Sequence, residues 1–351
     1  MKFSRNPTGT PPDGPSPPES PAPPGRHRRL RLIAALAGVA AVAITLTAVF
    51  TGIASASTQA AGAHRSGLPW ASGVYQPNST PASLATFGTW RGHPMDVATV
   101  WGNRATWNEV INPAFLFKRW QHAPETLALG MPMLPQNVPG VSIQACATGA
   151  YNSYWRQFGT NISAYGLGSS IIRLGWEFNG NWYIWQASNP ATWVKCWQQI
   201  VTSARSTAPN LQWDWNVNRG VSAGLADPTK AYPGDAYVTT IGVDNYDQWP
   251  PATTAAGWNK QLNGPQGLMY WLNFAQAHGK KFAIPEWGNM TTGTDPGRDD
   301  PAFVTDMLGF FKAHASSLAW EANFQGPNIN NSTYGPGSVV PKSSAAYQAN
   351  F

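Results

Sequence analysis

The order of apolar and amphipathic segments after Gly73 predicts an α/β protein whose eight parallel strands close into a (β/α)8 barrel. Eight short apolar segments of strand length alternate with stretches of helical periodicity. The chain has 351 residues, of which 42% are hydrophobic and 12% aromatic, enough for one large core but not for several. An open, doubly wound sheet is the alternative fold. It is disfavoured because no glycine-rich phosphate loop follows any strand.

The predicted strands come from the apolar runs. They cover residues 73–76, 95–101, 126–134, 170–177, 211–217, 238–246, 281–287 and 318–324. Helices are expected over 151–165, 190–207, 267–278 and 301–315. Helical periodicity is weak between the first two strands and around 107–120, so the element bounds are least defined there.

The N-terminal part is not expected to belong to the barrel. Residues 1–25 are dominated by proline, glycine, serine and threonine, which predicts disorder. A basic cluster then precedes an uncharged apolar run over residues 32–54, which is long enough to cross a bilayer. The run ends in Ala54-Ser55-Ala56, a pattern that suits signal peptidase. Residues 26–56 are therefore either a cleaved signal peptide or an uncleaved membrane tether.

The remaining boundaries follow from this interpretation. Residues 57–72 are expected to form a linker and residues 73–351 the barrel domain, with no further domain after it. With either version of the leader, the barrel is expected outside the cytoplasm, secreted or anchored on the outer face of the membrane.

The charge distribution argues against a nucleic-acid partner. The net charge is +6, but six of the 23 basic and two of the 17 acidic residues precede Ser57, which leaves 17 against 15. No basic cluster remains in the barrel part, so a neutral partner is favoured. For a secreted barrel of this size we expect a monomer.

Two cysteines, Cys146 and Cys196, are present, and the leader implies an oxidising compartment. We expect a disulfide joining the loop after the third strand to the helix after the fourth. The alternative is a pair of separate buried thiols.

Two glutamates lie at predicted strand ends, where a barrel assembles its active site. Glu177 closes the fourth predicted strand and Glu286 lies at the end of the seventh. Two carboxyl groups facing each other across the mouth of a barrel are what glycoside hydrolysis requires, one to protonate the leaving oxygen and one to attack the anomeric carbon.

The surroundings of Glu177 strengthen this hypothesis. By alternation along the strand, Arg173 is expected on the same face, where it can orient a carboxylate. Trp182 and Trp185 follow in the next loop and offer flat faces on which sugar rings can stack. The alternative is that these tryptophans belong to the core.

Three segments carry a family resemblance. Arg173-x-x-x-Glu177 with Asn179-Gly180-x-Trp182 and Trp185 resembles the acid/base motif of glycoside hydrolase family 26, best known for β-mannanases. Residues 232–246 resemble the sixth-strand segment of that family, and the segment Phe282-Ala-Ile-Pro-Glu286-Trp-Gly288 resembles its nucleophile strand. The resemblance implies a barrel in which Glu177 is the acid/base and Glu286 the nucleophile. It also implies that Tyr246 hydrogen-bonds the nucleophile and that Arg173 supports the site.

One departure concerns the residue before the acid/base. Mannanases of the family usually carry histidine there, whereas this chain has Trp176, with a larger ring and a single N–H donor. The innermost sugar subsite is therefore expected to differ.

The substrate-binding candidates are the polar and aromatic residues near the two glutamates. They are Arg173, Trp176, Asn179, Trp182, Trp185, Asp244, Tyr246, Trp287 and Trp320. Asp244 enters because it shares the strand face of Tyr246, and Trp320 because a tryptophan platform on the eighth strand is common in this clan. Asp96 and Asp214 are expected to be structural partners of Arg173 or of backbone groups.

No metal or cofactor is expected. The histidines, at positions 27, 64, 93, 122, 278 and 314, show no ligand spacing, and no calcium loop or serine-hydrolase elbow occurs.

The hypothesis is a retaining hydrolase of a β-linked polysaccharide, with β-mannan or a related β-1,4 or mixed-linkage glycan as substrate. The alternatives are a non-catalytic carbohydrate-binding or cell-wall protein on the same scaffold, and a transglycosylase.

Overall fold

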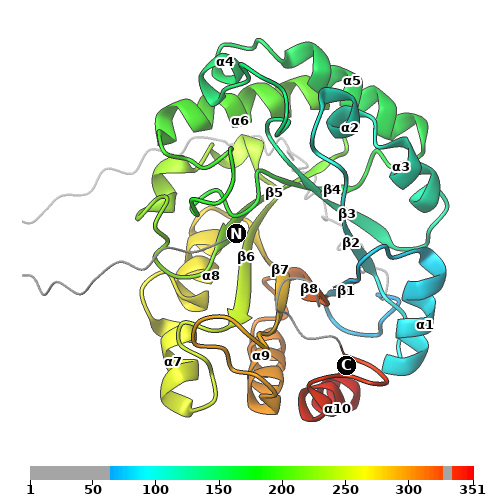
Figure 1. Cartoon of the computed structure of the whole chain (residues 1–351), viewed down its shortest axis with the longest axis vertical. Coiled ribbons are helices and arrows are strands. Elements are labelled where there is room, and N and C mark those ends of the chain that lie inside the picture. The colour runs from blue at the N-terminus through cyan, green and yellow to red at the C-terminus, as the bar shows by residue number, and fades with distance from the viewer. Residues whose placement is uncertain (1–63, 327–333) are drawn as a thin grey trace, which may run out of the picture. The chain divides into compact units, whose positions relative to one another are not determined.

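The computed structural model describes residues 64–326 and 334–351, and its centre is a closed barrel of eight parallel strands (Figure 1). The strands follow one another around the barrel in chain order, and β1 closes it by pairing with β8 from Ala71↔Trp320 to Tyr75↔Phe324. The predicted (β/α)8 barrel is confirmed, and the open doubly wound sheet is excluded.

All eight predicted strands are present. They are β1 (Ala71–Tyr75), β2 (Val97–Trp101), β3 (Thr126–Met131), β4 (Ile171–Leu174), β5 (Gln212–Asn218), β6 (Thr240–Asp247), β7 (Lys281–Asn289) and β8 (Leu318–Phe324). Most bounds differ from the predicted ones by one or two residues. The exceptions are β3 and β4, which each end three residues before the predicted position because the chain leaves the barrel wall there.

Helices surround the barrel. They are α1 (Pro81–Arg91), α2 (Trp107–Ile111), α3 (Ala114–Trp120), α4 (Ile143–Ala147), α5 (Asn152–Ala164), α6 (Pro190–Arg205), α7 (Ala255–Asn263), α8 (Leu268–Ala277), α9 (Pro301–Ala313) and α10 (Pro341–Asn350). Two short 3-10 turns, Pro228–Ala231 and Asp235–Tyr237, precede β6. The four predicted helices correspond to α5, α6, α8 and α9.

Helix α1 lies where the apolar periodicity was too weak to predict it. Its start is defined instead by a capping box, in which the Thr80 hydroxyl accepts from Ser83 N while the Ser83 hydroxyl accepts from Thr80 N. Pro81 at the first helical position fits this start because its missing N–H would have had no partner.

The segment before β1 and the C-terminal tail both pack on the barrel. Arg65 pairs with Glu125 at 3.0 Å and Trp70 is buried, so residues 64–72, the described part of the expected linker, contact the barrel. At the other end, the tail forms α10, and its Tyr347 and Phe351 lie against Trp287 on the outer wall of the barrel, with ring centroids 6.0 and 5.6 Å away.

The interior of the barrel is apolar near the start of the strands and polar near their C-terminal ends. Trp320 fills the lower part with small and branched side chains from neighbouring strands, namely Val97, Ala128, Ile171, Ala283 and Ala322. Arg173 and the acidic groups around it lie above this layer. The charged groups are therefore brought together at the end where barrel enzymes hold their active sites.

A bulge in β7 sets the direction of Glu286. The register with β8 shifts between Ile284 and Trp287, and the register with β6 shifts between Gly242 and Asn245. Pro285 lies in this stretch and has no N–H to give to the ladder. The extra residue restarts the alternation, so Glu286 points to the interior and Trp287 to the helices.

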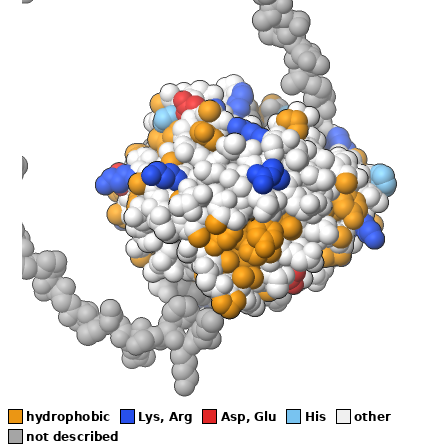
Figure 2. Space-filling model, turned by 90° about the horizontal axis from the view of Figure 1, so that it is seen from above, with side chains coloured by type: hydrophobic (Ala, Val, Ile, Leu, Met, Phe, Trp, Pro, Cys, Tyr) orange, Lys and Arg blue, Asp and Glu red, His pale blue; other side chains and the backbone are white. Residues whose placement is uncertain are grey.

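The predicted leader, residues 1–56 with its apolar run at 32–54, lies outside the described residues. Among the residues that are described, none of the helices has the length and apolar character to cross a bilayer. On the face shown in Figure 2, the lysine and arginine side chains lie apart from one another rather than in one patch.

The predicted disulfide is confirmed. Cys146 of α4 is bonded to Cys196 of α6, with the Cα atoms 4.9 Å apart and both side chains buried. It joins the connection after β3 to α6, the helix that follows the loop carrying Glu177 along the chain.

Replacing both cysteines by serine is expected to destabilise the protein. The bond closes a loop of 50 residues, for which the chain-entropy relation gives about 4 kcal/mol. Urea unfolding of the variant under oxidising conditions should show this loss, and wild type measured with a reductant should approach the variant. Equal midpoints for variant and wild type would contradict a stabilising role for the bond.

Candidate active site

Glu177 lies in the loop after β4. The strand ends at Leu174, and the chain then turns through Gly175 at φ 54° and Glu177 at φ 52°. A Cβ at Gly175 would lie 2.7 Å from Met133 Sδ, so glycine is required there both for space and for its φ. The prediction that the strand runs to Glu177, so that Arg173 and Glu177 share a strand face by alternation, is wrong.

The turn places Glu177 under backbone strain. A non-glycine residue at positive φ costs on the order of 1–3 kcal/mol and persists only where its surroundings hold it. Here Glu177 N donates to Asn216 O at 3.1 Å, and Gly180 N donates to Glu177 O at 3.0 Å. Such strained residues are concentrated at functional sites.

Glu177 is half-buried, and its carboxyl group accepts two hydrogen bonds. Asn218 Nδ2 donates to Oε1 at 2.6 Å, and Trp182 Nε1 donates to Oε2 at 3.0 Å. Burial and the negative charge of Glu286 raise the pKa of Glu177, the two hydrogen bonds and Arg173 lower it, and the net result is a pKa of about 7. Glu177 can therefore hold a proton near neutral pH, as a general acid must.

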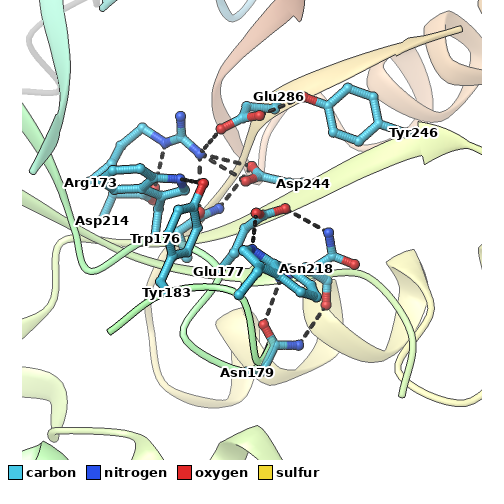
Figure 3. Close-up of polar contacts among 12 residues, drawn as sticks. Arg173, Trp176, Glu177, Asn179, Tyr183, Asp214, Asn218, Asp244, Tyr246 and Glu286 are labelled. Carbon is cyan, nitrogen blue, oxygen red and sulfur yellow. Dashed lines mark hydrogen bonds and ion pairs between the residues drawn. The ribbon is translucent and has the colours of Figure 1, made fainter. Parts of the chain in front are cut away.

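Glu286 has a different environment, although the two carboxyl groups lie near each other (Figure 3). Its side chain is buried, with 5% of the residue exposed. The Tyr246 hydroxyl donates to Oε2 at 2.5 Å, and Arg173 Nη2 lies 2.8 Å from Oε1. Both oxygens are thus fixed in place, and the Tyr246 contact implied by the family resemblance is present.

Arg173 is the centre of a buried charge cluster. Its Nη2 lies 3.0 and 2.9 Å from the two Asp244 oxygens and 3.0 Å from Asn216 Oδ1, and its Nε lies 4.0 Å from Asp214. The guanidinium also stacks on the Trp101 ring, 5.2 Å from its centroid. Arg173 therefore connects β2, β4, β5 and β6 below the two glutamates.

The acidic neighbours keep Arg173 charged. Burial alone lowers the pKa of the guanidinium, but Asp244, Glu286 and Asp214 outweigh this effect and raise it. Burial raises the pKa of Asp214 more than Arg173 and the Thr240 hydrogen bond lower it, which leaves a pKa of about 6. The Thr240 hydroxyl donates to Asp214 at 2.6 Å. Asp214 is thus the structural partner of Arg173 that the sequence predicted.

Asp96 and Asp244 also form hydrogen bonds with groups inside the protein. Asp96 accepts from Ser66 N and Ser72 N, which confirms its expected role as a partner of backbone groups. The prediction that Asp244 reaches the substrate is wrong, because Asp244 is 1% exposed and its oxygens are used by Arg173 and Asn216.

Asn179 positions the residue that binds Glu177. It is fully buried, and its side-chain amide donates to Asn218 O at 2.8 Å and accepts from Asn218 N at 2.9 Å. This two-way contact fixes the end of β5 and with it the Asn218 side chain. Asn179 is therefore a positioning residue rather than a sugar contact. Asn218 itself was missed because the strand was predicted to stop at Val217.

The loop after Glu177 presents Trp182 as an exposed ring. Half of this residue, 50%, is accessible to solvent, although its N–H is held by Glu177. An exposed aromatic face directly beside a catalytic candidate suits stacking against a sugar ring. This position agrees with the one predicted for Trp182.

Trp185 and Trp176 lie underneath the same loop. Trp185 is fully buried, stacks on Tyr183 at 4.3 Å and 14°, and donates to Trp176 O, so its predicted role as a sugar platform is wrong. Trp176 is 3% exposed, and its single N–H donates to Tyr183 Oη at 3.0 Å. Its predicted direct contact with the sugar is not supported, because no free donor and little ring surface remain.

Tyr183, which sequence reasoning missed, is the accessible member of this group. Burial raises the pKa of its hydroxyl, and the negative charges of Glu177 and Glu286 raise it further. Because Tyr183 Oη accepts from Trp176, its own proton is available for another acceptor.

Two further predicted contacts are wrong. Trp287 points outward to α9 and α10 and donates to Glu321 at 2.6 Å. Trp320 faces the interior as expected but lies near the start of β8, level with Ala71. On the same face of β8, Phe324 occupies the C-terminal end and contacts Tyr75 and Tyr246.

No group of three or more metal-ligating side chains (His, Cys, Asp or Glu) that could hold an ion was found within residues 64–326 and 334–351.

The fold and the site define a class: closed (β/α)8 barrels with one carboxyl group after β4 and a second in β7. Residues 169–286 match the family model described as glycosyl hydrolase family 26. The chain is thus similar to that family over the segment that holds both glutamates, and the resemblance predicted from the motifs is confirmed.

Curated relatives and solved structures agree with this match. A mannan endo-1,4-beta-mannosidase of Bifidobacterium adolescentis is 25% identical over 177 residues, which are 47% of this chain and 17% of that protein. Endoglucanase H of Acetivibrio thermocellus is 26% identical over 141 residues, 38% of this chain and 14% of the relative. The matches thus span less than a fifth of either curated relative.

Among solved structures, a modular endo-beta-1,4-mannanase from Cellulomonas fimi has the same fold. It superposes with a TM-score of 0.60 at 17% identity, over 79% of this chain and 70% of the other.

Replacing Glu177 by glutamine is expected to stabilise the protein at high pH. The folded pKa of Glu177, about 7, lies above its ordinary value, so the wild type loses stability as the pH rises from the ordinary value to about 7. The urea midpoint of Glu177→Gln relative to wild type should therefore be higher at pH 8 than at pH 5. The exposed control Asn259→Ala, which removes no titratable group, should show no such trend. A pH-independent difference for Glu177→Gln would contradict the assigned environment.

Proposed function

We propose that this protein is a retaining glycoside hydrolase that cleaves a β-linked polysaccharide, with Glu177 as acid/base and Glu286 as nucleophile. The observation that carries the proposal is the contrast between the two carboxyl groups. The pKa of Glu177 is raised to about 7, whereas Glu286 is paired with Arg173 and Tyr246. Two carboxyl groups in opposite environments are the pattern of an acid and a nucleophile.

In the first step, an oxygen of Glu286 attacks the anomeric carbon while protonated Glu177 gives its proton to the glycosidic oxygen. The bond between that carbon and oxygen breaks, and the leaving sugar departs with the proton. The sugar that remains is bonded to Glu286 as an ester. Arg173 and Tyr246 hold the Glu286 carboxylate in place for this attack.

In the second step, ionised Glu177 takes a proton from water, and the resulting hydroxide attacks the anomeric carbon. The ester bond breaks, Glu286 is again a carboxylate, and Glu177 is again protonated. Two displacements at one carbon retain its configuration. The hydrogen bonds from Asn218 and Trp182 stabilise the ionised Glu177 that appears between the steps.

The substrate we propose is β-mannan or a related β-1,4 or mixed-linkage glycan. The similar proteins named above include a mannosidase and an endoglucanase. Trp182 supplies a stacking surface. Trp176 stands where mannanases usually carry the histidine before the acid/base, and its single N–H is occupied by Tyr183 Oη. We therefore infer a changed preference at the innermost subsite.

We further propose that the barrel acts outside the cytoplasm. The Cys146–Cys196 bond supports this, because structural disulfides persist in oxidising compartments. Fractionation of cells producing the protein should find it in the medium or on the outer face of the membrane, and recovery from the cytoplasm alone would contradict the proposal.

The central test is reducing-sugar release from glucomannan, galactomannan, barley β-glucan and xylan. We expect wild type to act on at least one polymer and Glu286→Ala to be inactive. Glu177→Ala should lose about 100- to 10,000-fold, the usual contribution of a general acid. Proton NMR of the first product should show the retained anomer. Binding to a polymer without release, unchanged in both variants, would favour a non-catalytic carbohydrate-binding protein.

Replacing Asn218 by alanine is expected to shift the pH dependence. Activity should fall as the pH rises through about 7, where Glu177 loses its proton. The Asn218 hydrogen bond lowers the pKa of Glu177, so its removal should raise that pKa and move the basic limb of kcat/KM to higher pH. The exposed control Asn259→Ala should keep the wild-type profile. A shift of the Asn218→Ala limb to lower pH would contradict the account.

Replacing Tyr183 by phenylalanine removes only the hydroxyl. We expect kcat/KM on the preferred polymer to fall roughly 3- to 10-fold, the value of one hydrogen bond. The thermal midpoint, measured in parallel, separates this effect from a loss of folding. An unchanged kcat/KM would show that Tyr183 does not contact the substrate.

A further inference from the structure

A small pocket beside the two glutamates has no role in the mechanism above. It lies where β1 and β2 end and α3 begins, with a volume of about 170 Å³. Pockets for drug-sized ligands measure roughly 300–1,000 Å³, so this one has room for a single small unit. Its lining includes the aromatic residues Tyr75, Trp101 and Phe115, the amides Gln76, Asn78 and Asn103, and Arg119.

The pocket shares a wall with the catalytic site. Trp101 lines the pocket, and its ring lies 5.2 Å from the guanidinium carbon of Arg173. Tyr75 meets Trp101 edge-on at 4.7 Å. Tyr75 also stacks on Phe324 at 4.3 Å, and Phe324 contacts Tyr246, which donates a hydrogen bond to Glu286. A polymer held at the glutamates could therefore place a neighbouring unit in this pocket.

The lining suits a sugar ring. Aromatic faces come from Tyr75, Trp101 and Phe115, and Phe115 is 51% exposed at the mouth. The amide side chains of the lining can both donate to and accept from hydroxyl groups. Aromatic surfaces together with amides are a combination that binds pyranoses.

The pocket also carries a positive charge without a carboxylate partner. In the part of the chain that the structure describes, the Arg119 guanidinium makes one hydrogen bond, from Nη1 to Ser79 O at 3.1 Å, and no ion pair. It also lies 6.0 Å from the Phe115 ring centroid, which restricts its orientation. No aspartate or glutamate lines the pocket. Arginine in this state is suited to bind a carboxylate through two parallel hydrogen bonds.

We propose that this pocket is a subsite for a carboxylate-bearing sugar, a uronic acid unit of the polysaccharide, recognised by Arg119. The proposal rests on the hydrolase function given above, because it assigns a chemical class to one unit of the same substrate. It implies that the natural polymer carries acidic units or branches close to the cleaved bond.

The test uses small probes that do not depend on the backbone of the polymer. Methyl glycosides of glucuronate, galacturonate and mannuronate are titrated into the protein by ligand-detected NMR, each against its neutral counterpart with a hydroxymethyl group. We expect at least one uronate to bind roughly 10-fold or more tightly than its neutral counterpart, the range of a hydrogen bond to a charged group. The difference should shrink as salt is added.

Variants of Arg119 test whether the preference for uronates comes from this pocket. Arg119→Met should abolish the preference for the uronate, and Arg119→Lys should keep part of it. The exposed control Arg156→Met on α5 should leave it unchanged. Equal binding of uronates and neutral glycosides, no uronate binding up to the highest probe concentration, or a preference that survives Arg119→Met would overturn the proposal.

Different results would rule out the uronate subsite and the hydrolase function. Hydrolysis of neutral polymers by wild type, with no Arg119-dependent uronate binding, would remove the subsite and leave the hydrolase. Arg119-dependent uronate binding without hydrolysis of any polymer would leave the pocket as a binding site and remove the hydrolase.

Discussion

The rest of the site depends on the ion pairs and hydrogen bonds of the buried Arg173 guanidinium. It is fully enclosed and contacts Trp101 of β2, Asp214 and Asn216 of β5, Asp244 of β6 and Glu286 of β7. A charge in such a place is tolerated only when paired and hydrogen-bonded. The interior carboxylates are therefore needed by the fold, and one of them, Glu286, is also the proposed nucleophile.

The two active-site candidates are the same residue type, and they differ in the groups that surround them. Glu286 is paired with the Arg173 guanidinium and accepts a hydrogen bond from the Tyr246 hydroxyl. Glu177 lies on a strained turn outside the barrel wall, where burial and the charge of Glu286 raise its pKa. Two hydrogen bonds from Asn179 fix Asn218, and Asn218 in turn orients the Glu177 carboxyl group. One buried cation and one strained turn thus give two chemically equal side chains different surroundings.

The sequence was sufficient for the barrel and for both glutamates, because apolar runs mark parallel strands and acids near strand ends mark the C-terminal face. It was insufficient where the backbone departs from regular geometry. The positive φ values at Gly175 and Glu177 end β4 early, and the bulge near Pro285 resets alternation in β7. Alternation also gives the face of a side chain but not its depth, so Trp320 was placed at the mouth although it fills the bottom of the barrel.

The sequence also does not show which aromatic residues are exposed and which are buried. With 18 tryptophans in the chain, composition cannot distinguish an exposed platform from a buried support. Trp182 and Trp185 are three positions apart on one loop, yet one is half exposed and the other fully buried. No sequence pattern marks Tyr183, because its place in the site follows from its hydrogen bond with Trp176 Nε1.

The most direct test of this account is the protonation state of Glu177 itself. Carbon-13 NMR of side-chain carboxyl groups, with Glu177→Gln used to identify its resonance, would follow its titration in the folded protein. The account predicts a midpoint near 7 for Glu177. A midpoint at the ordinary value of a glutamate would show that the carboxyl group is ionised at neutral pH, and would contradict its assignment as the acid.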